Sequence, residues 1–302
     1  MKKMFAVVAA LLTAVAAWAG PEPAGDNLIE KQYDYRNFTG LSVSHSFGVE
    51  LKQGSRYAVM VQVPGYLEPY LRVKVVNDVL VIGLDNLPKR IQLELNRENS
   101  SLKAFVTMPQ LYSLQMSGAT SLQSEDRFKV DNYPFKMQLS GASRVQSLSV
   151  SGKGKAYVRT SGASSAVLTC DFDEWDVEQS GSSGFRLRGG ARKLDAGLSG
   201  ASWAVFEDGF SEAKVETSGS AKVRLNGRVG VLSVGGSGAS SVETAETQEC
   251  EVDLSGAAKC KVSVQKRLKV DLSGASSCHY QAPRGLDVEI ESVSRGASLK
   301  RM

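Results

Sequence analysis

The chain of 302 residues repeats one short motif, Ser-Gly followed by Ala or Ser, nine times. The motif serines are Ser117, Ser140, Ser161, Ser180, Ser199, Ser218, Ser237, Ser255 and Ser273, and the spacings between them are 23, 21, 19, 19, 19, 19, 18 and 18 residues. A nearly constant period of this length is typical of a small structural unit stacked on copies of itself. The sequence therefore predicts a solenoid, with long, flat, repetitive faces rather than a preformed pocket.

Three positions of the repeat are apolar in every unit when the nine units are aligned on the serine. They lie five and three residues before the serine and five residues after it. Polar side chains such as Lys136 and Asp195 stand between the first two positions. Alternation with period two is a strand signal, and helical spacing does not fit it. Each unit is predicted to hold two or three short strands, and stacked units to bury one core, as in a parallel β-helix.

The glycine of each motif is expected at a tight corner, because glycine adopts a positive φ without a Cβ clash. These predicted turn residues are Gly118, Gly141, Gly162, Gly181, Gly200, Gly219, Gly238, Gly256 and Gly274. Strands of neighbouring coils stack ~4.8 Å apart. The corner serines would then form a ladder of hydroxyl groups.

The first 19 residues have the features of a secretory signal peptide. Lys2 and Lys3 precede an apolar run, and the small residues Ala17 and Ala19 flank Trp18 before the expected cleavage after Ala19. We therefore expect an exported protein, in the periplasm, at the cell surface or outside the cell. No other segment is long and apolar enough to predict a transmembrane helix in the mature chain.

Residues 20–110 lack the motif but read as a β-rich region that leads into the solenoid and caps it. Alternating segments include residues 41–45, 59–63, 71–75 and 91–95. Residues 111–302 are predicted to hold the β-helix repeats and a C-terminal cap. The long first spacing carries extra residues near 127–134, which we expect to form a protruding loop.

Several of these features together resemble one family. They are the leader, the segments 38–43 (FTGLSV), 49–54 (VELKQG) and 106–114 (VTMPQLYSL), and the serial Ser-Gly-Ala units. This combination resembles the auto-transporter adhesin head GIN domain family, which is common in Bacteroidetes. The resemblance covers most of residues 36–290. It implies a single-stranded, right-handed parallel β-helix and an exported location, and it brings no catalytic residues.

The four cysteines leave two interpretations open. Cys250, Cys260 and Cys278 fall in the apolar columns, which favours buried free thiols. Cys260 and Cys278 lie one period apart, so a disulfide between them is the alternative. Cys170 lies outside the three columns and is expected to be single.

No residue set predicts a catalytic, cofactor or metal site. The two histidines, His45 and His279, lie far apart on predicted strands, which gives a catalytic triad or a zinc site little support. The acidic residues Asp171, Asp173, Glu174 and Asp176 could hold calcium, but a solvated turn is the favoured interpretation. The segment 235–240 resembles the start of a calcium-binding nonapeptide, yet Ser240 stands where the aspartate ligand belongs.

One outward strip is a candidate ligand patch. It comprises Trp203 and Lys222, four residues after their serines, and Arg186 and Arg224, six residues after theirs. Trp203 is expected to lie between the two arginines of adjacent coils and to suit an anionic sugar. The alternative is a surface tryptophan covered by arginine stems.

The charge balance shows no excess of basic side chains of the kind that is typical of nucleic-acid-binding proteins. The 36 basic side chains, less the two leader lysines, leave 34 against 32 acidic ones. We therefore expect a non-enzymatic protein with a binding or structural role at the cell envelope, and a surface glycan or an envelope protein as its partner. A polysaccharide-active enzyme is one alternative, which a cleft with two facing carboxylates would favour. An assembly element that stacks through its coil ends is another. The oligomeric state is open.

Overall fold

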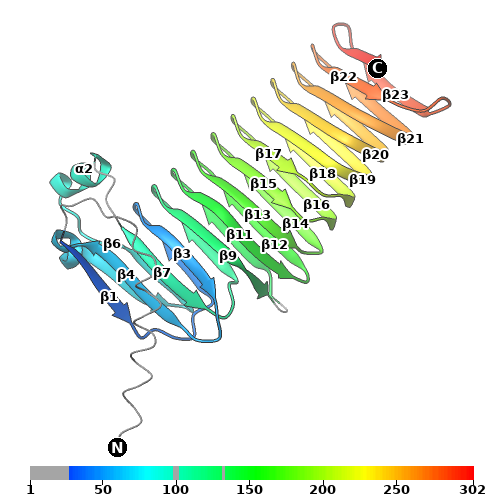
Figure 1. The fold of residues 1–302 in the computed structure, drawn as a ribbon. Helices are drawn as coiled ribbons and strands as arrows, with labels where there is room; N and C mark the ends of the chain where they lie inside the picture. Colours follow the sequence, from blue (N-terminus) through cyan, green and yellow to red (C-terminus); the bar gives the residue numbers. More distant parts are fainter. Residues whose placement is uncertain (1–26, 98–101, 131–132) are drawn as a thin grey trace, which may run out of the picture.

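The computed structural model describes residues 27–97, 102–130 and 133–302. These residues form a rod-like β-solenoid of about 10 turns with coils of about 19 residues (Figure 1). The predicted repeat architecture is confirmed. The predicted signal peptide, residues 1–19, lies outside the described residues. Among the described residues, no helix combines the length and the apolar character needed to span a membrane.

Each coil places one strand before its Ser-Gly corner and one after it, and the two kinds of strand stack into separate parallel arrays. The first sheet contains β8 (Ser113–Met116), β10 (Phe135–Leu139), β12 (Lys155–Thr160), β14 (Glu174–Gln179), β16 (Ala191–Leu198) and β18 (Phe210–Thr217). The second sheet contains β9 (Ser121–Val130), β11 (Arg144–Gly152), β13 (Ser165–Asp171), β15 (Gly184–Arg188) and β17 (Trp203–Phe206). Further along, the long strands β19 (Lys222–Gly236), β20 (Ser241–Leu254) and β21 (Lys259–Leu272) each contribute to both sheets, with shifts of register between their two halves.

The corners explain why the motif requires glycine. All nine corner glycines have φ between +65° and +79°. From the second corner on, the residue after the glycine donates its N–H to the glycine carbonyl one coil earlier, as Ser182 does to Gly162 at 2.7 Å. A Cβ on Gly181 would lie only 2.6 Å from the Gly162 carbonyl oxygen. Glycine therefore satisfies both the backbone conformation and the close stacking of the corners.

The three apolar columns form the core, as predicted. All their residues are buried except Tyr112, which is half-buried at the first coil. Small hydroxyl side chains also point inward beside the corners, and some of them pair between coils. Thr160 Oγ1 donates to Ser183 Oγ at 3.1 Å, and Thr217 Oγ1 donates to Ser240 Oγ at 2.9 Å. These pairs satisfy polar groups that would otherwise be costly to bury.

The N-terminal region continues both sheets before it ends them. Strands β2 and β3 form a complete coil against β8 and β9. Strands β6 and β7 extend the two sheets on the far side of this coil. Antiparallel strands then cover the ends, β5 on the first sheet and β4 followed by β1 on the second. The bounds are β1 (Leu28–Tyr33), β2 (Gly40–Val43), β3 (Gly48–Gln53), β4 (Ala58–Pro64), β5 (Leu71–Val76), β6 (Val79–Leu84) and β7 (Lys103–Met108), with a 3₁₀ helix η2 (Gly65–Tyr70) between β4 and β5.

The C-terminal coil repeats the architecture in a looser form. It consists of β22 (Ser277–Gln281), β23 (Asp287–Val293) and β24 (Ser298–Arg301). Ser294 and Gly296 build a further corner with one extra residue, and Gly296 has φ of +111°. This corner was missed in the sequence because Arg295 interrupts the Ser-Gly pair.

Three local predictions are wrong. Residues 91–95 do not form a strand but lie in α2 (Lys89–Arg97), where Ile91 and the buried Leu95 are four residues apart on one face. His45 lies in a turn after β2 rather than on a strand. Residues 127–130 are not a protruding loop, because they lengthen β9 and pair with β11. Cys170 lies outside the three columns and is unpaired, as predicted, and it is buried because it stacks on Val150 in a further inward column.

Candidate functional site

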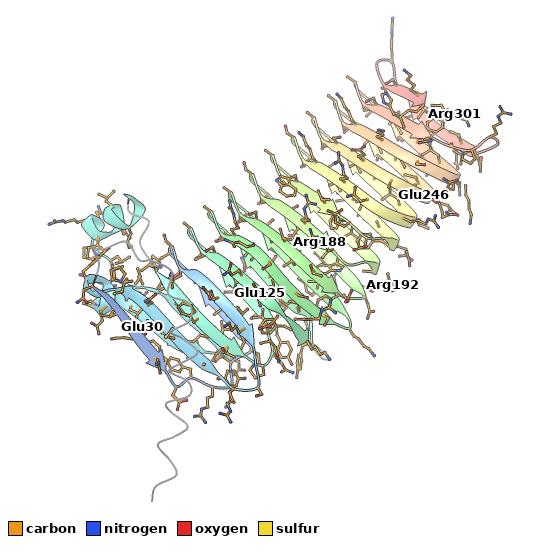
Figure 2. All side chains as sticks on the ribbon, in the orientation of Figure 1. Glu30, Glu125, Arg188, Arg192, Glu246 and Arg301 are labelled. Atoms are coloured by element: carbon orange, nitrogen blue, oxygen red, sulfur yellow. The ribbon has the colours of Figure 1, made fainter. Side chains whose placement is uncertain are left out.

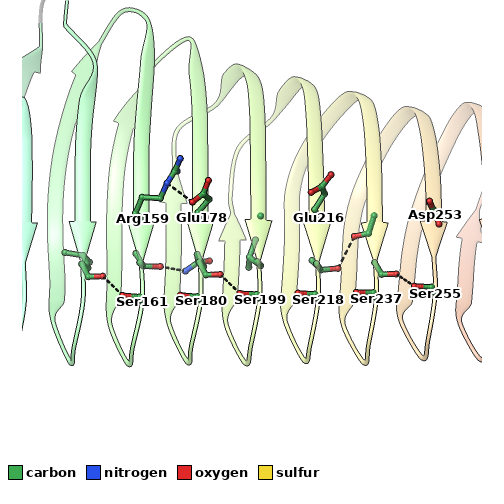
Figure 3. A pocket seen from close by; sticks show the side chains of 18 of the residues that line it. Arg159, Ser161, Glu178, Ser180, Ser199, Glu216, Ser218, Ser237, Asp253 and Ser255 are labelled. Carbon is green, nitrogen blue, oxygen red and sulfur yellow. Dashed lines mark hydrogen bonds and ion pairs between the residues drawn. The ribbon is translucent and has the colours of Figure 1, made fainter.

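A groove runs along the outer face of the first sheet, beside the Ser-Gly corners (Figure 3). It has a volume of about 830 Å³ and crosses the coils from Gln138 to Ser255, parallel to the long axis of the solenoid. The expectation of flat faces without a preformed depression is therefore wrong for this part of the surface.

Two outward positions of each coil line the groove. One position is the corner serine, and these serines form one row in Figure 3. At the other position, two residues earlier, acidic residues alternate with Gly197 and Gly235. A Cβ on Gly197 would have no atom within 4 Å. The absence of side chains at these glycines leaves the depression open.

The carboxylates of the groove are Glu178, Glu216 and Asp253, two coils apart in one column. Arg159 Nε lies 2.8 Å from Glu178 Oε2, and Lys214 Nζ lies 2.6 Å from Glu216 Oε1. Two coils correspond to roughly 10 Å along the axis. Glycosidases place two carboxyl groups on opposite sides of the scissile bond. The three carboxylates of the groove lie in one column and do not face one another.

A second depression, of about 420 Å³, adjoins the groove at its N-terminal end. Its lining includes Tyr157, Lys136, Gln115 and Pro134, and we call it the Tyr157 pocket. It shares Gln138 and Arg159 with the groove, so the two depressions form one continuous surface feature.

Asp176 organises the charges behind the Tyr157 pocket. Its carboxylate lies 2.8 Å from Lys155 Nζ and accepts a 2.6 Å hydrogen bond from Arg159 Nη1. Burial raises the pKa of Asp176, but the hydrogen bonds from Lys155 and Arg159 outweigh that effect and lower it overall. Lys155 Nζ also lies 4.8 Å from the centroid of the Tyr157 ring. Asp176 therefore holds the lysine, which in turn lies over the ring.

The predicted strip with Trp203 lies on the other sheet, and its geometry differs from the expectation. Trp203 is in register with Gly184 and Lys222, whereas Arg186 and Arg224 are in register with Val205. Trp203 therefore does not lie between the two arginines. The indole lies so close to Gly184 that a Cβ there would come within 2.5 Å of the ring, and 41% of Trp203 is exposed.

Both arginines of the strip are engaged by carboxylates. Arg186 Nη1 donates to Glu207 Oε1 at 2.5 Å, and Arg224 Nη2 donates to Glu243 Oε2 at 2.8 Å. A hydrogen bond from Asn226, followed by the charge of Arg186, lowers the pKa of Glu207. The hydrogen bond from Arg224 likewise lowers the pKa of Glu243. The cationic charge of the strip is thus largely compensated within the protein.

The acidic residues 171–176 do not converge on a common point. Asp171 pairs with Arg127 at 3.5 Å, Asp173 accepts the Gly154 N–H at 2.8 Å, and Glu174 pairs with Arg192, which is labelled in Figure 2. Within the described parts of the chain, no three His, Cys, Asp or Glu side chains are grouped to hold a metal ion. Ser240, at the missing aspartate position, is buried and bonded to Thr217. His45 and His279 lie in a turn near the N-terminal cap and on β22, respectively.

The groove is not among the features predicted from the sequence, although one pattern in the sequence indicates it. The position two residues before the serine runs Glu178, Gly197, Glu216, Gly235 and Asp253 in successive units. This alternation of charge and glycine predicts gaps in an outward column. The Tyr157 pocket has no comparable signal, because its residues come from neighbouring coils of unequal length.

Comparison with known proteins agrees with this architecture. A profile of the family described as "Putative auto-transporter adhesin, head GIN domain" matches residues 37–209 and 205–282. The chain belongs to this family. The resemblance inferred from the sequence is therefore confirmed. No curated protein is significantly similar to this head GIN domain chain.

Solved structures with a similar fold come from two Parabacteroides species. A structure described as a putative adhesin from Parabacteroides distasonis has a TM-score of 0.57 and 16% identity, and the match covers 92% of this chain and 98% of that one. One described as a putative adhesin from Parabacteroides merdae has a TM-score of 0.55 and 14% identity, with 91% and 96% covered. A third, described as a putative lipid binding protein from P. distasonis, has a TM-score of 0.54 and 15% identity, with 91% and 97% covered. At these identities, the likeness concerns the fold alone.

Proposed function

We propose that this protein is exported and acts without catalysis at the cell envelope, where it binds a linear glycan along the groove of the first sheet. The observation that carries the proposal is the regular repeat of polar groups along the groove, which suits a ligand that is itself a repeating polymer. A hydroxyl-bearing corner recurs at every coil, and a carboxylate recurs at every second coil. A polymer with a repeat of roughly 10 Å would meet the same groups several times along the rod.

The chemistry of the groove suits sugars better than an apolar ligand. Serine hydroxyls both donate and accept hydrogen bonds, and carboxylates accept them from sugar hydroxyls. Ser161 and Ser199 make only long bonds of 3.4 and 3.3 Å to backbone carbonyls of the preceding coil. These hydroxyls therefore retain acceptor capacity toward a ligand in the groove.

The membership of an adhesin family supports a binding role over an enzymatic one. The alternative of a polysaccharide-active enzyme finds no facing pair of carboxylates in the groove. The alternative of assembly through coil ends has support in the C-terminal coil, where Ile290 and Val293 continue the core columns but are 56% and 39% exposed.

Glycan-array binding by the mature protein tests the proposal. The groove variant Gly197→Trp places an indole in open space on the groove floor. We expect it to remove binding of any linear glycan that the wild type retains, while its melting temperature stays close to that of the wild type. Gln265→Trp, at an exposed position outside the groove, is the matched control. Unchanged binding by Gly197→Trp would refute the groove as the site.

Export and lack of catalysis are tested separately. Expression in the native host followed by fractionation and N-terminal sequencing should give a processed chain that begins at Gly20 in an envelope or extracellular fraction. Incubation with glycan-array hits should release no new reducing ends and no unsaturated products. A cytoplasmic, unprocessed chain, or turnover of a bound glycan, would contradict the respective part of the proposal.

A further inference from the structure

We propose that the Tyr157 pocket is a subsite for an acidic sugar, whose ring lies on Tyr157 and whose carboxylate pairs with Lys136. This inference rests on the proposed glycan-binding function and specifies one end of the ligand. The pocket of about 420 Å³ has a wall formed by Tyr157 and Arg159 of one coil. The remaining lining comes from the two coils that precede it, including Lys136 and Gln115.

Tyr157 is a prepared aromatic platform. The residue is half-buried on β12, it lines the pocket, and Lys155 Nζ lies 4.8 Å from its ring centroid. Asp176 holds Lys155 in place at 2.8 Å. An aromatic ring supported in this way offers an apolar surface at little entropic cost. The apolar face of a pyranose ring matches such a surface.

Lys136 supplies a charge that no described carboxylate compensates. It is in register with Tyr157 on the neighbouring strand and is exposed at the pocket. Among the described residues, no carboxylate pairs with Lys136. Lys155 and Arg159, by contrast, are both bound by Asp176, and Arg159 also contacts Glu178. The pocket therefore presents one available ammonium group, which favours an anionic ligand.

Two amide side chains complete the set. Gln115 and Gln138 are in register with each other, both are exposed, and both line the pocket. Their amide groups donate and accept hydrogen bonds, as the hydroxyl groups of a sugar require. The combination of an aromatic face, a free cation and two amides is that of an acidic pyranose site. From this subsite the polymer would continue into the groove past Gln138 and Arg159, which line both depressions.

The test is direct binding of acidic oligosaccharides and their carboxyl-reduced counterparts. Isothermal titration of the mature protein would use oligogalacturonates, oligomannuronates and glucuronate-containing oligosaccharides, each beside its neutral, reduced form. At least one acidic ligand should bind, and its reduced form should bind at least tenfold more weakly. Lys136→Gln should abolish this preference and flatten the dependence of affinity on salt. Tyr157→Ala should weaken both forms at least tenfold.

Matched variants exclude indirect effects. Tyr133→Ala removes an exposed tyrosine outside the pocket, and Lys266→Gln removes an exposed lysine far along the chain. Both should bind like the wild type. Lys136→Gln changes only an exposed side chain and should keep the wild-type melting temperature, so the inference remains testable even if Tyr157→Ala is unstable.

The outcomes separate the inference from the proposed function. Equal binding of acidic and reduced ligands, or wild-type behaviour of Lys136→Gln, would overturn the acidic subsite. If Gly197→Trp still blocks glycan binding in that case, the groove proposal stands. Absence of binding to every acidic ligand, together with Gly197-dependent binding of neutral ones, would likewise overturn only the subsite.

Discussion

His45 occupies, one coil before Gly118, the corner position that glycine holds in the nine repeats. Its carbonyl accepts the Ala119 N–H at 2.7 Å, just as the Gly118 carbonyl accepts the Ala142 N–H at 2.7 Å. Its φ of 70° is close to the 79° of Gly118. The first corner of the solenoid therefore tolerates a side chain in the left-handed region, which is uncommon for residues other than glycine.

The imidazole of His45 contributes to this tolerance by bonding to the neighbouring coil. Its Nδ1 accepts the Leu84 N–H at 3.3 Å and lies 2.9 Å from Ser44 Oγ. An N–H donor at Nδ1 requires that nitrogen to be unprotonated. Burial lowers the pKa of His45, and the charge of Asp85 opposes this only in part.

We therefore predict that mild acid weakens the N-terminal coil. Because the folded-state pKa is lowered, the unfolded chain binds more protons, and stability falls as the pH falls below about 6.5. Urea unfolding at neutral pH and near pH 5 should show this loss in the wild type. His45→Asn, which tolerates the left-handed region, should reduce the pH dependence, whereas His279→Asn on β22 should not. Equal pH dependence in all three proteins would contradict the prediction.

The corner glycines should be far less replaceable than the groove glycines. Gly181→Ala places a Cβ 2.6 Å from the Gly162 carbonyl oxygen at a φ of +69°. We expect it to lower the free energy of unfolding by about 1–3 kcal/mol. Gly197→Ala meets no atom within 4 Å and should change stability by less than about 0.5 kcal/mol. Chemical denaturation of the two variants compares them directly, and equal effects would show that corner stacking is not limiting.

The cysteines are expected to react only after unfolding. All four are free and buried, and Cys260 is in register with Cys278. Burial raises the pKa of Cys170 to about 12. A hydrogen bond with Cys278, together with burial, raises the pKa of Cys260. A thiol reagent should label none of them in the native protein and all four in denaturant. Rapid native labelling would refute the burial, and a Cys260–Cys278 crosslink in mass spectrometry would establish the alternative disulfide.

Trp203 should contribute to stability through its cover over Gly184. We expect Trp203→Ala to lower the free energy of unfolding by about 1–2 kcal/mol, because it uncovers a glycine on the adjacent strand. Lys222→Ala, in register on the other side, should have little effect on the free energy of unfolding.

The paired variant Arg186→Ala with Arg224→Ala should bind acidic glycans like the wild type, since Glu207 and Glu243 already engage both arginines. A loss of affinity in the paired variant at low salt would instead support the strip as a ligand site.

The sequence alone determined the solenoid, its core and its corners. Each unit of about 19 residues contains the same apolar positions and one corner glycine. These requirements are local, and they recur in every unit. Val215 and Val234 are buried for the same reason, because each continues the same column one coil further on. Because the same pattern recurs in nine units, the assignment of a position to the core does not depend on any single unit.

Only the tertiary structure decided the N-terminal order of strands, the extra corners and the groove. Strands β6 and β7 pair with β2 and β3 on the side away from the repeats, whereas β8, the next strand in the chain, pairs with β2 on the opposite side. Pairing between segments that are distant in the sequence determines this order. His45 and Gly296 build corners that lack the motif. The Tyr157 pocket depends on the strand register between coils of different length. It also depends on which basic side chains form ion pairs with carboxylates. Such relationships arise from pairing between distant segments, and a periodic pattern within one strand does not encode them.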